Sequence, residues 1–230
     1  MKQLTTKAII LSRTDYGEAD RIVTLLTPEA GKLRLIARGV RKSKSKLAGG
    51  IELFSVSDIT YMHGKGDLGT LISARLDKHY GKIIQDITRV QLGYDLIKLL
   101  NKITEDNPDS EYFHLLDQSF SALNDAALPV DLVRLWFEAQ LIKFGGHEPD
   151  LFSDTTGQKL EQGKIYTFSF EDMAFAVHPT GSFGADQIKF LRLVFQGHQP
   201  NALMQVQGAA EFAGQVKPLL ESLRRIQLQH

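Results

Sequence analysis

The residue types most able to do chemistry are cations gathered between residues 32 and 46, a stretch with seven Lys or Arg and no acid. Ser43 and Ser45 alternate with the last of these cations as small groups that hydrogen-bond phosphate. Such arrays bind nucleic-acid backbones, because neutralised phosphates release counterions. The predicted nucleic-acid-binding residues are Lys32, Arg34, Arg38, Arg41, Lys42, Lys44 and Lys46. Two alternatives stay open: a solvated strand face with a mobile loop, and a site for an anionic protein.

A glycine-rich motif at residues 64–69, with the sequence GKGDLG, has the spacing of a dinucleotide-binding fingerprint. In that fingerprint the last glycine opens a helix whose N-terminus faces the pyrophosphate. Residues 70–75 (TLISAR) instead have the composition of a strand. We therefore predict a hairpin between two strands, with Lys65 as a further phosphate contact.

Aromatic side chains could stack on bases. The candidates in the first part of the chain are Tyr16, Phe54, Tyr61 and Tyr80. Packing in the core or between domains explains each of them at least as well. The acids around Tyr16, which include Asp15 and Asp20, argue against phosphate binding at that loop.

Residue patterns for catalysis or metal binding do not occur in the sequence. The histidines lack the spacing of metal ligands on a helix, and neither a P-loop nor a G-x-S-x-G elbow is present. The chain has no cysteine, so we expect no zinc and no other cofactor. We predict a protein that is not an enzyme; the alternative is a hydrolase that uses His147, Glu148 or His178.

The charge is distributed unevenly along the chain although its net value is zero. Residues 1–80 carry 14 Lys or Arg and 8 Asp or Glu, so the remaining 150 residues are net acidic. An asymmetry of this kind suggests that the first part meets a polyanion, and the alternative is a random scatter of charge between two domains. The apolar runs are far shorter than the roughly 20 residues of a membrane helix, so we expect no membrane partner. No signal peptide is visible, and we expect a cytoplasmic, nucleoid-associated protein.

The element that must position the cations is a β-strand at residues 32–38, in which Leu33, Leu35 and Ala37 share one face and the cations share the other. It is one of five short strands separated by turn residues, which together predict an OB-type barrel. The predicted strands are residues 7–13, 20–27, 32–38, 51–62 and 68–78.

The pattern becomes helical after Gly81, with apolar residues at helical spacing up to about residue 100. Another predicted helix begins at Pro129, buries one face that includes Trp136, and ends at Gly145-Gly146. The other predicted elements are helices at 110–124, 185–196 and 208–226 and a hairpin-like insert at about 147–182. The fold class is therefore α+β, with an N-terminal domain at residues 1–80 and a helical domain at residues 81–230.

Several sequence motifs together resemble the RecO family of recombination mediators. Such motifs occur in both halves, so that the resemblance covers essentially the whole chain. They include residues 8–11 (AIIL), 16–23 (YGEADRIV), 37–45 (ARGVRKSKS), 145–149 (GGHEP) and 188–192 (IKFLR).

The resemblance implies an N-terminal OB-fold, a helical C-terminal domain and a role in DNA repair. It implies binding of single- and double-stranded DNA, annealing of complementary strands, and loading of recombinase on single strands coated by single-stranded-DNA-binding protein (SSB). The implied protein partners are RecR and the acidic C-terminal tail of SSB, which ends in an apolar residue. A site for this tail needs an apolar pocket beside cations. The candidates are Arg134, Lys143, Arg192, Arg224 and Arg225.

The chain departs from the family at a zinc-binding insert that holds two C-x-x-C pairs in many members. Ser153 and Thr156 stand where the first pair is expected, and Ala176 and Pro179 where the second is expected. We therefore expect packing to replace the metal. The side chains expected to pack are Tyr166, Phe168, Phe170 and Phe175.

Overall fold

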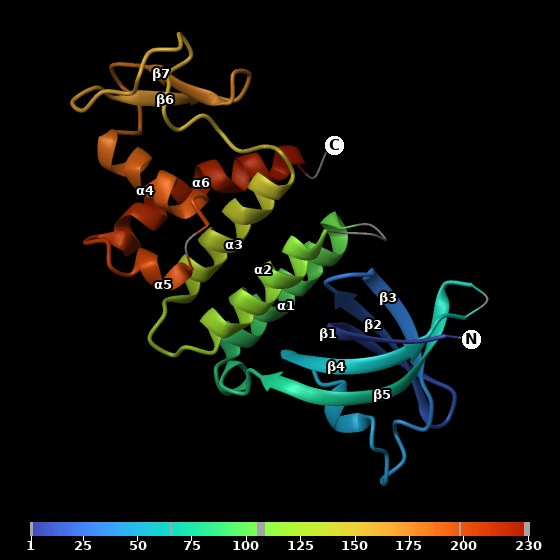
Figure 1. Cartoon of the computed structure of the whole chain (residues 1–230). Coiled ribbons are helices and arrows are strands. Elements are labelled where there is room, and N and C mark those ends of the chain that lie inside the picture. Colours follow the sequence, from blue (N-terminus) through green and yellow to red (C-terminus); the bar gives the residue numbers. More distant parts are fainter. Residues whose placement is uncertain (1, 65, 105–108, 198, 228–230) are drawn as a thin grey trace. The chain divides into compact units, whose positions relative to one another are not determined.

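The computed structural model describes residues 2–64, 66–104, 109–197 and 199–227. The chain forms two compact units, Met1–Ala126 and Ala127–His230. The first unit contains a five-stranded sheet and two α-helices, and the second contains further helices and a two-stranded sheet (Figure 1). The sequence predicted two functional domains, residues 1–80 and 81–230. A division into compact units does not test these domains, so they stay a prediction.

Five strands build the sheet of the first unit. They are β1 (Gln3–Tyr16), β2 (Asp20–Thr27), β3 (Gly31–Ala37), β4 (Ser55–Met62) and β5 (Leu68–His79). Their order is β1-β2-β3-β5-β4, and β4 also pairs with β1, so the sheet closes on itself. β3 and β5 pair in parallel over Arg34–Ile36 and Leu68–Thr70, whereas the other neighbours are antiparallel. The closed sheet followed by helices confirms the predicted α+β class and is consistent with an OB-fold.

Alternation along β3 decides which side chains reach solvent. Leu35 and Ala37 are buried in the sheet core and Leu33 packs against it, whereas Arg34 is exposed. The period-2 pattern expected from the sequence is confirmed, because successive side chains of a strand point to opposite faces.

The glycine motif joins β4 to β5, as predicted, and no helix follows it because β5 begins at Leu68. A Cβ atom on Gly64 would lie 2.0 Å from the carbonyl oxygen of Leu68. The turn therefore requires glycine at this position. Lys65 lies outside the described residues.

Two helices, α1 (Ile87–Ile103) and α2 (Ser110–Leu123), complete the first unit. The ring of Phe54, just before β4, makes edge contacts with Tyr94 and Phe120 at centroid distances of 5.3 and 5.4 Å. A Cβ atom on Gly93 would lie 2.5 Å from this ring, so α1 approaches it closely. Phe54 also has a φ of 54°, which is costly for a residue with a side chain. The packing of its ring therefore offsets a strained backbone.

The helices of the second unit surround α3. They are α3 (Val130–Phe144), α4 (Ala185–Phe195), the short α5 (Pro200–Leu203) and α6 (Ala209–Gln227). The expectation of a single buried face on α3 is too narrow, since Leu132, Leu135 and Ile142 are buried as well as Trp136. α4, α5 and α6 all pack against α3. Sequence patterns did not predict α5, a single turn opened by proline.

The insert contains one hairpin, β6 (Tyr166–Ser169) with β7 (Ala174–Val177). The expected aromatic packing occurs around Phe168, whose ring contacts Phe170 and Phe175 at 5.0 and 5.2 Å. Tyr166 is buried, and its hydroxyl accepts a hydrogen bond from the backbone of Glu161.

A carboxylate organises the segment where the first cysteine pair was expected. Asp154 accepts hydrogen bonds from the hydroxyl of Thr156 at 2.6 Å and from the backbone N–H groups of Thr156 and Gln158. The Thr156 hydroxyl contributes most to holding the pKa of Asp154 below its usual value. Among the described residues, no group of three His, Cys, Asp or Glu side chains is arranged to hold a metal ion. A hydrogen-bonded turn and an aromatic cluster thus shape the insert.

Candidate nucleic-acid interface

A row of exposed cations in the first unit follows β3 and the loop after it. Within the described residues, five of the seven predicted cations make neither an ion pair nor a hydrogen bond through their side chains. We call these five the basic surface: Arg34, Arg38, Lys42, Lys44 and Lys46. All five are exposed, so their charges are available to a ligand.

Lys32 has a structural role instead. Its ammonium group donates hydrogen bonds to the carbonyl oxygens of Asn101, at 2.7 Å, and Thr104. These carbonyls lie at the C-terminal end of α1, where backbone acceptors lack partners within the helix. Lys32 therefore ties the end of α1 to the sheet, although it also lines a groove described below.

Arg41 pairs with the hairpin formed by β1 and β2. Its Nε lies 3.6 Å from a carboxylate oxygen of Asp15, and its backbone N–H donates to Ala19 at 2.9 Å. Asp20 in turn accepts from the backbone N–H of Gly39 at 2.7 Å. A hydrogen bond from Arg21, and then the charge of Arg41, hold the pKa of Asp15 below its usual value. Asp15 and Asp20 of this hairpin thus anchor the start of the loop that follows β3.

A polar groove of about 580 Å³ opens beside the first residues of β3. Arg34 and Lys32 line one side, and His63 and Asp67 come from the turn between β4 and β5. By the register of β3 with β5, this turn lies at the start of β3, whereas the loop with Lys42 follows its end. A strand advances roughly 3.3 Å per residue, so β3 separates the two by about 20 Å. The basic surface therefore runs along β3 from the groove to the loop.

Three of the four aromatic candidates are unsuited to stacking. Phe54, Tyr61 and Tyr80 are buried, and burial is the first cause that raises the pKa of Tyr80. Tyr80 also donates a hydrogen bond to Asp117. Tyr16, with 53% of its surface exposed, is the one of the four that a base could reach.

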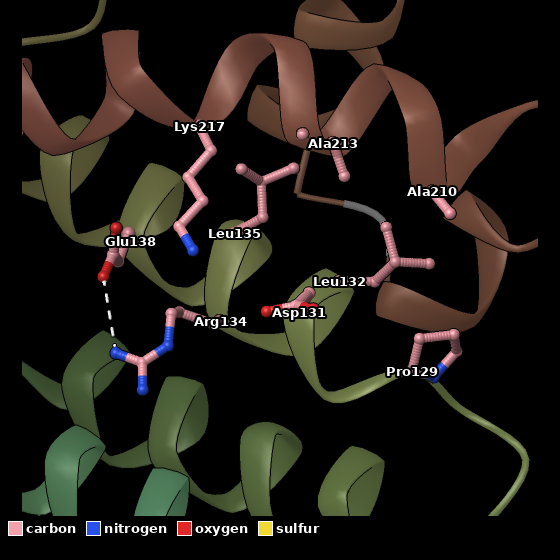
Figure 2. A pocket seen from close by; sticks show the side chains of 10 residues that line it. Pro129, Asp131, Leu132, Arg134, Leu135, Glu138, Ala210, Ala213 and Lys217 are labelled. Carbon is pink, nitrogen blue, oxygen red and sulfur yellow. Dashed lines mark ion pairs between the residues drawn. The ribbon is translucent and has the colours of Figure 1, made fainter.

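The second unit contains a smaller pocket of about 190 Å³ between α3 and α6 (Figure 2). Leu132 and Leu135 from α3 and Ala213 from α6 supply apolar walls. Arg134 and Lys217 place cations at the same pocket. This combination can hold a short ligand that is apolar at its end and acidic beside it.

The predicted partner cations divide by their contacts. Lys143 donates to the carbonyl oxygen of Phe195 at 3.1 Å and pairs with Glu148 at 3.7 Å. Arg192 donates to the carbonyl oxygen of Leu151 at 2.7 Å. These bonds fix backbone segments.

The other cations lie closer to the pocket or in solvent. Arg134 lines the pocket, Arg224 lies 3.7 Å from the pocket residue Glu138, and Arg225 is exposed. Lys217 was missed by sequence reasoning. Its spacing from Glu221 and Arg224, four and seven residues, places all three on one face of α6 and could have indicated it.

The residues of the alternative hydrolase have other partners. Glu148 pairs with Lys143, and Nδ1 of His178 lies 3.2 Å from the hydroxyl of Thr180. The backbone N–H of Thr180 donates to the same nitrogen at 3.3 Å, so the contact between these near neighbours in sequence belongs to a local turn. None of the described helices combines the length and apolar character needed to cross a membrane.

Comparison with known proteins gives matches along most of the chain. Residues 1–80 match the family model "Recombination protein O N terminal", and residues 84–186 match "Recombination protein O C terminal". The chain is 33% identical over 146 residues to the DNA repair protein RecO of Halalkalibacterium halodurans, an alignment that covers 63% of this chain and 57% of the relative.

Two further relatives carry the same name. The protein of Roseiflexus sp. is 36% identical over 64% of this chain and 51% of its own length. That of Bacillus pumilus is 33% identical over 75% of this chain and 66% of its own length. The matched part thus spans between about half and two thirds of these three relatives.

Proposed function

The chain belongs to the RecO family of DNA repair and recombination proteins, and from this premise we propose that it binds single- and double-stranded DNA through the basic surface. The observation that supports this most is a row of five exposed cations whose side chains have no ion-pair or hydrogen-bond partner within the described part of the chain, on a closed sheet consistent with an OB-fold. OB-folds bind oligonucleotides with one sheet face and the adjoining loops.

Annealing of complementary strands follows from this charge. Two single strands repel each other through their phosphates, and cations that neutralise some of them lower the repulsion. No bond is made or broken, so the proposed activity needs no catalytic group. We propose that the protein also helps to load recombinase on SSB-coated strands, with RecR as a partner, and that it acts at the nucleoid in the cytoplasm.

A titration of the whole protein with fluorescent single strands of 5 to 40 nucleotides tests DNA binding. We expect affinity to rise with length until the site is filled, at roughly 4–16 nucleotides for one OB-fold. Four to five phosphate contacts at about −0.7 each predict that log affinity falls against log salt with a slope of about −3 to −4. Weak binding that does not depend on length would instead favour the alternative function, a scaffold whose basic loop holds an acidic protein.

The pocket between α3 and α6 is the proposed site for the acidic tail of SSB. Its apolar walls suit a terminal apolar side chain, and Arg134 and Lys217 suit the carboxylates beside it. Charge complementarity of this kind gives specificity and speeds association.

Replacing Arg134 and Lys217 together by Ala is expected to weaken binding of a tail peptide about tenfold. Each partly exposed charge pair contributes roughly 0.7 kcal/mol, and two losses multiply in the affinity. The measurement is fluorescence anisotropy with a labelled peptide. The matched control, Lys159→Ala with Lys189→Ala, removes the same charge from exposed positions of the same unit. Equal affinity of both double variants would place the tail elsewhere.

A further inference from the structure

Glu138 is a buried acid in the wall of the pocket between α3 and α6. Its side chain is 5% exposed and faces two guanidinium groups, Arg134 from one turn earlier on α3 and Arg224 from α6 (Figure 2 shows the first). The carboxylate oxygen lies 4.0 Å from Nη1 of Arg134 and 3.7 Å from Nε of Arg224. One buried negative charge therefore stands among the cations to which an acidic ligand would bind.

The contact with Arg224 is an ion pair without a hydrogen bond. At 3.7 Å the distance exceeds the 2.7–3.2 Å of an N–H···O bond. The Nε atom of Arg224 is buried and has no hydrogen-bond partner among the described residues. About a third of each Arg side chain is exposed, and Arg134 lines the pocket. Glu138 thus attracts Arg224 without accepting a hydrogen bond from its Nε.

Burial makes the charge of Glu138 costly. Loss of hydration raises the pKa of the Glu138 carboxyl above its usual value, while Arg224 and Arg134 act in the opposite direction. Glu221 adds to the rise, and Lys217 opposes it. A carboxylate from outside could pair with the same cations while it keeps part of its hydration.

We propose that Glu138 is a specificity-determining residue that competes with the carboxylates of an acidic ligand for Arg134, Arg224 and Lys217, and so limits the affinity of the pocket. The inference rests on the proposed role of this pocket as the site for an acidic tail. In the free protein the negative charge of Glu138 offsets part of the positive charge of these cations. The carboxylates of a bound acidic ligand lie near Glu138, and the like charges repel each other.

The size of the effect follows from Coulomb's law. Two like charges about 8 Å apart at an effective dielectric constant of about 40 repel each other by roughly 1 kcal/mol. Removal of one of them raises affinity about fivefold. Salt screens the repulsion, so the effect is largest at low ionic strength.

The competition also makes binding depend on pH. Among the described residues, the charged groups that line the pocket or act on Glu138 are Asp131 and Arg134 on α3 and Lys217, Glu221 and Arg224 on α6. Because the pKa of Glu138 is raised, the fraction of Glu138 that is neutral grows as the pH falls from 8 toward 5, while the aspartates of a ligand, with pKa values near 3.9, stay ionised. Affinity therefore increases as the pH falls through this range.

The experiment measures binding of a fluorescein-labelled peptide with three aspartates, a leucine and a C-terminal phenylalanine to the whole protein at about 50 mM salt. Glu138→Gln keeps the shape and removes the charge. We expect it to bind about fivefold more tightly than wild type at pH 7.5, with a melting temperature at least as high. Its affinity should stay constant between pH 8 and 5, where that of wild type rises.

Asp131→Asn is the matched control, because it removes the same charge from an exposed position at the same pocket. We expect less than a twofold change, since water screens this group. Two results would overturn the proposed competition: unchanged or weaker binding by Glu138→Gln, or a wild-type affinity that does not vary between pH 8 and 5. In either case the pocket keeps its proposed function as a site for an acidic tail. If wild type and Glu138→Gln both fail to bind the peptide, the proposed tail site and the competition both fall.

Discussion

Reversal of three charges on the basic surface, Arg38→Glu, Lys42→Glu and Lys44→Glu, is expected to weaken single-strand binding about a hundredfold at 0.1 M salt. Three lost phosphate contacts reduce the salt slope by about 2 units, which corresponds to two powers of ten between 1 M and 0.1 M salt. Repulsion from the new carboxylates adds to this loss. The loss should be the same for all sequences, because phosphate contacts carry no base information.

Arg41 is left intact in this variant because its ion pair with Asp15 and its neighbours anchor the loop. The three chosen side chains are exposed, so the melting temperature should not change. The matched control, Lys159→Glu, Lys164→Glu and Lys189→Glu, changes the net charge equally in the second unit. The measurement is fluorescence anisotropy across salt concentrations. If the triple charge-reversal variant binds DNA as tightly as wild type, the basic loop binds an acidic protein instead.

The largest effect on stability is expected at Phe54. Truncation of a buried Phe to Ala costs about 3–5 kcal/mol, and the ring of Phe54 fills the space between Tyr94, Phe120 and Gly93. This is a large part of the 5–15 kcal/mol that stabilises a typical domain. Chemical denaturation followed by circular dichroism measures the loss.

A second variant isolates the backbone strain at this residue. Phe54→Gly loses the same ring but relieves the φ of 54°, so it should be about 1 kcal/mol more stable than Phe54→Ala. Glycine is normally the less stable of the two, so the reversed order is diagnostic. Val177→Ala, at a position with 53% exposure, serves as the control and should change stability by less than about 0.5 kcal/mol. An Ala variant at position 54 as stable as wild type would contradict the packing argument.

Local sequence patterns were sufficient to predict most of the helices and strands. The predicted range 20–27 coincides with β2, and the change to helical spacing after Gly81 precedes α1. Gly145-Gly146 ends α3 as predicted, with Gly146 at a φ of 75°. These features are readable because strand and helix periods, caps and turns depend on residues only a few positions apart.

The sequence alone also determined that the cations of β3 lie opposite its apolar residues, and that residues 32–46 concentrate positive charge. It did not distinguish the seven cations from one another. Tertiary structure decided that Lys32 caps α1, 69 residues away, and that Arg41 pairs with Asp15. It also decided that Lys217 joins Arg134 at one pocket beside Glu138. The physical reason is that the period of an element fixes the direction of a side chain, whereas its partner depends on which distant segment the packing of the core brings next to it.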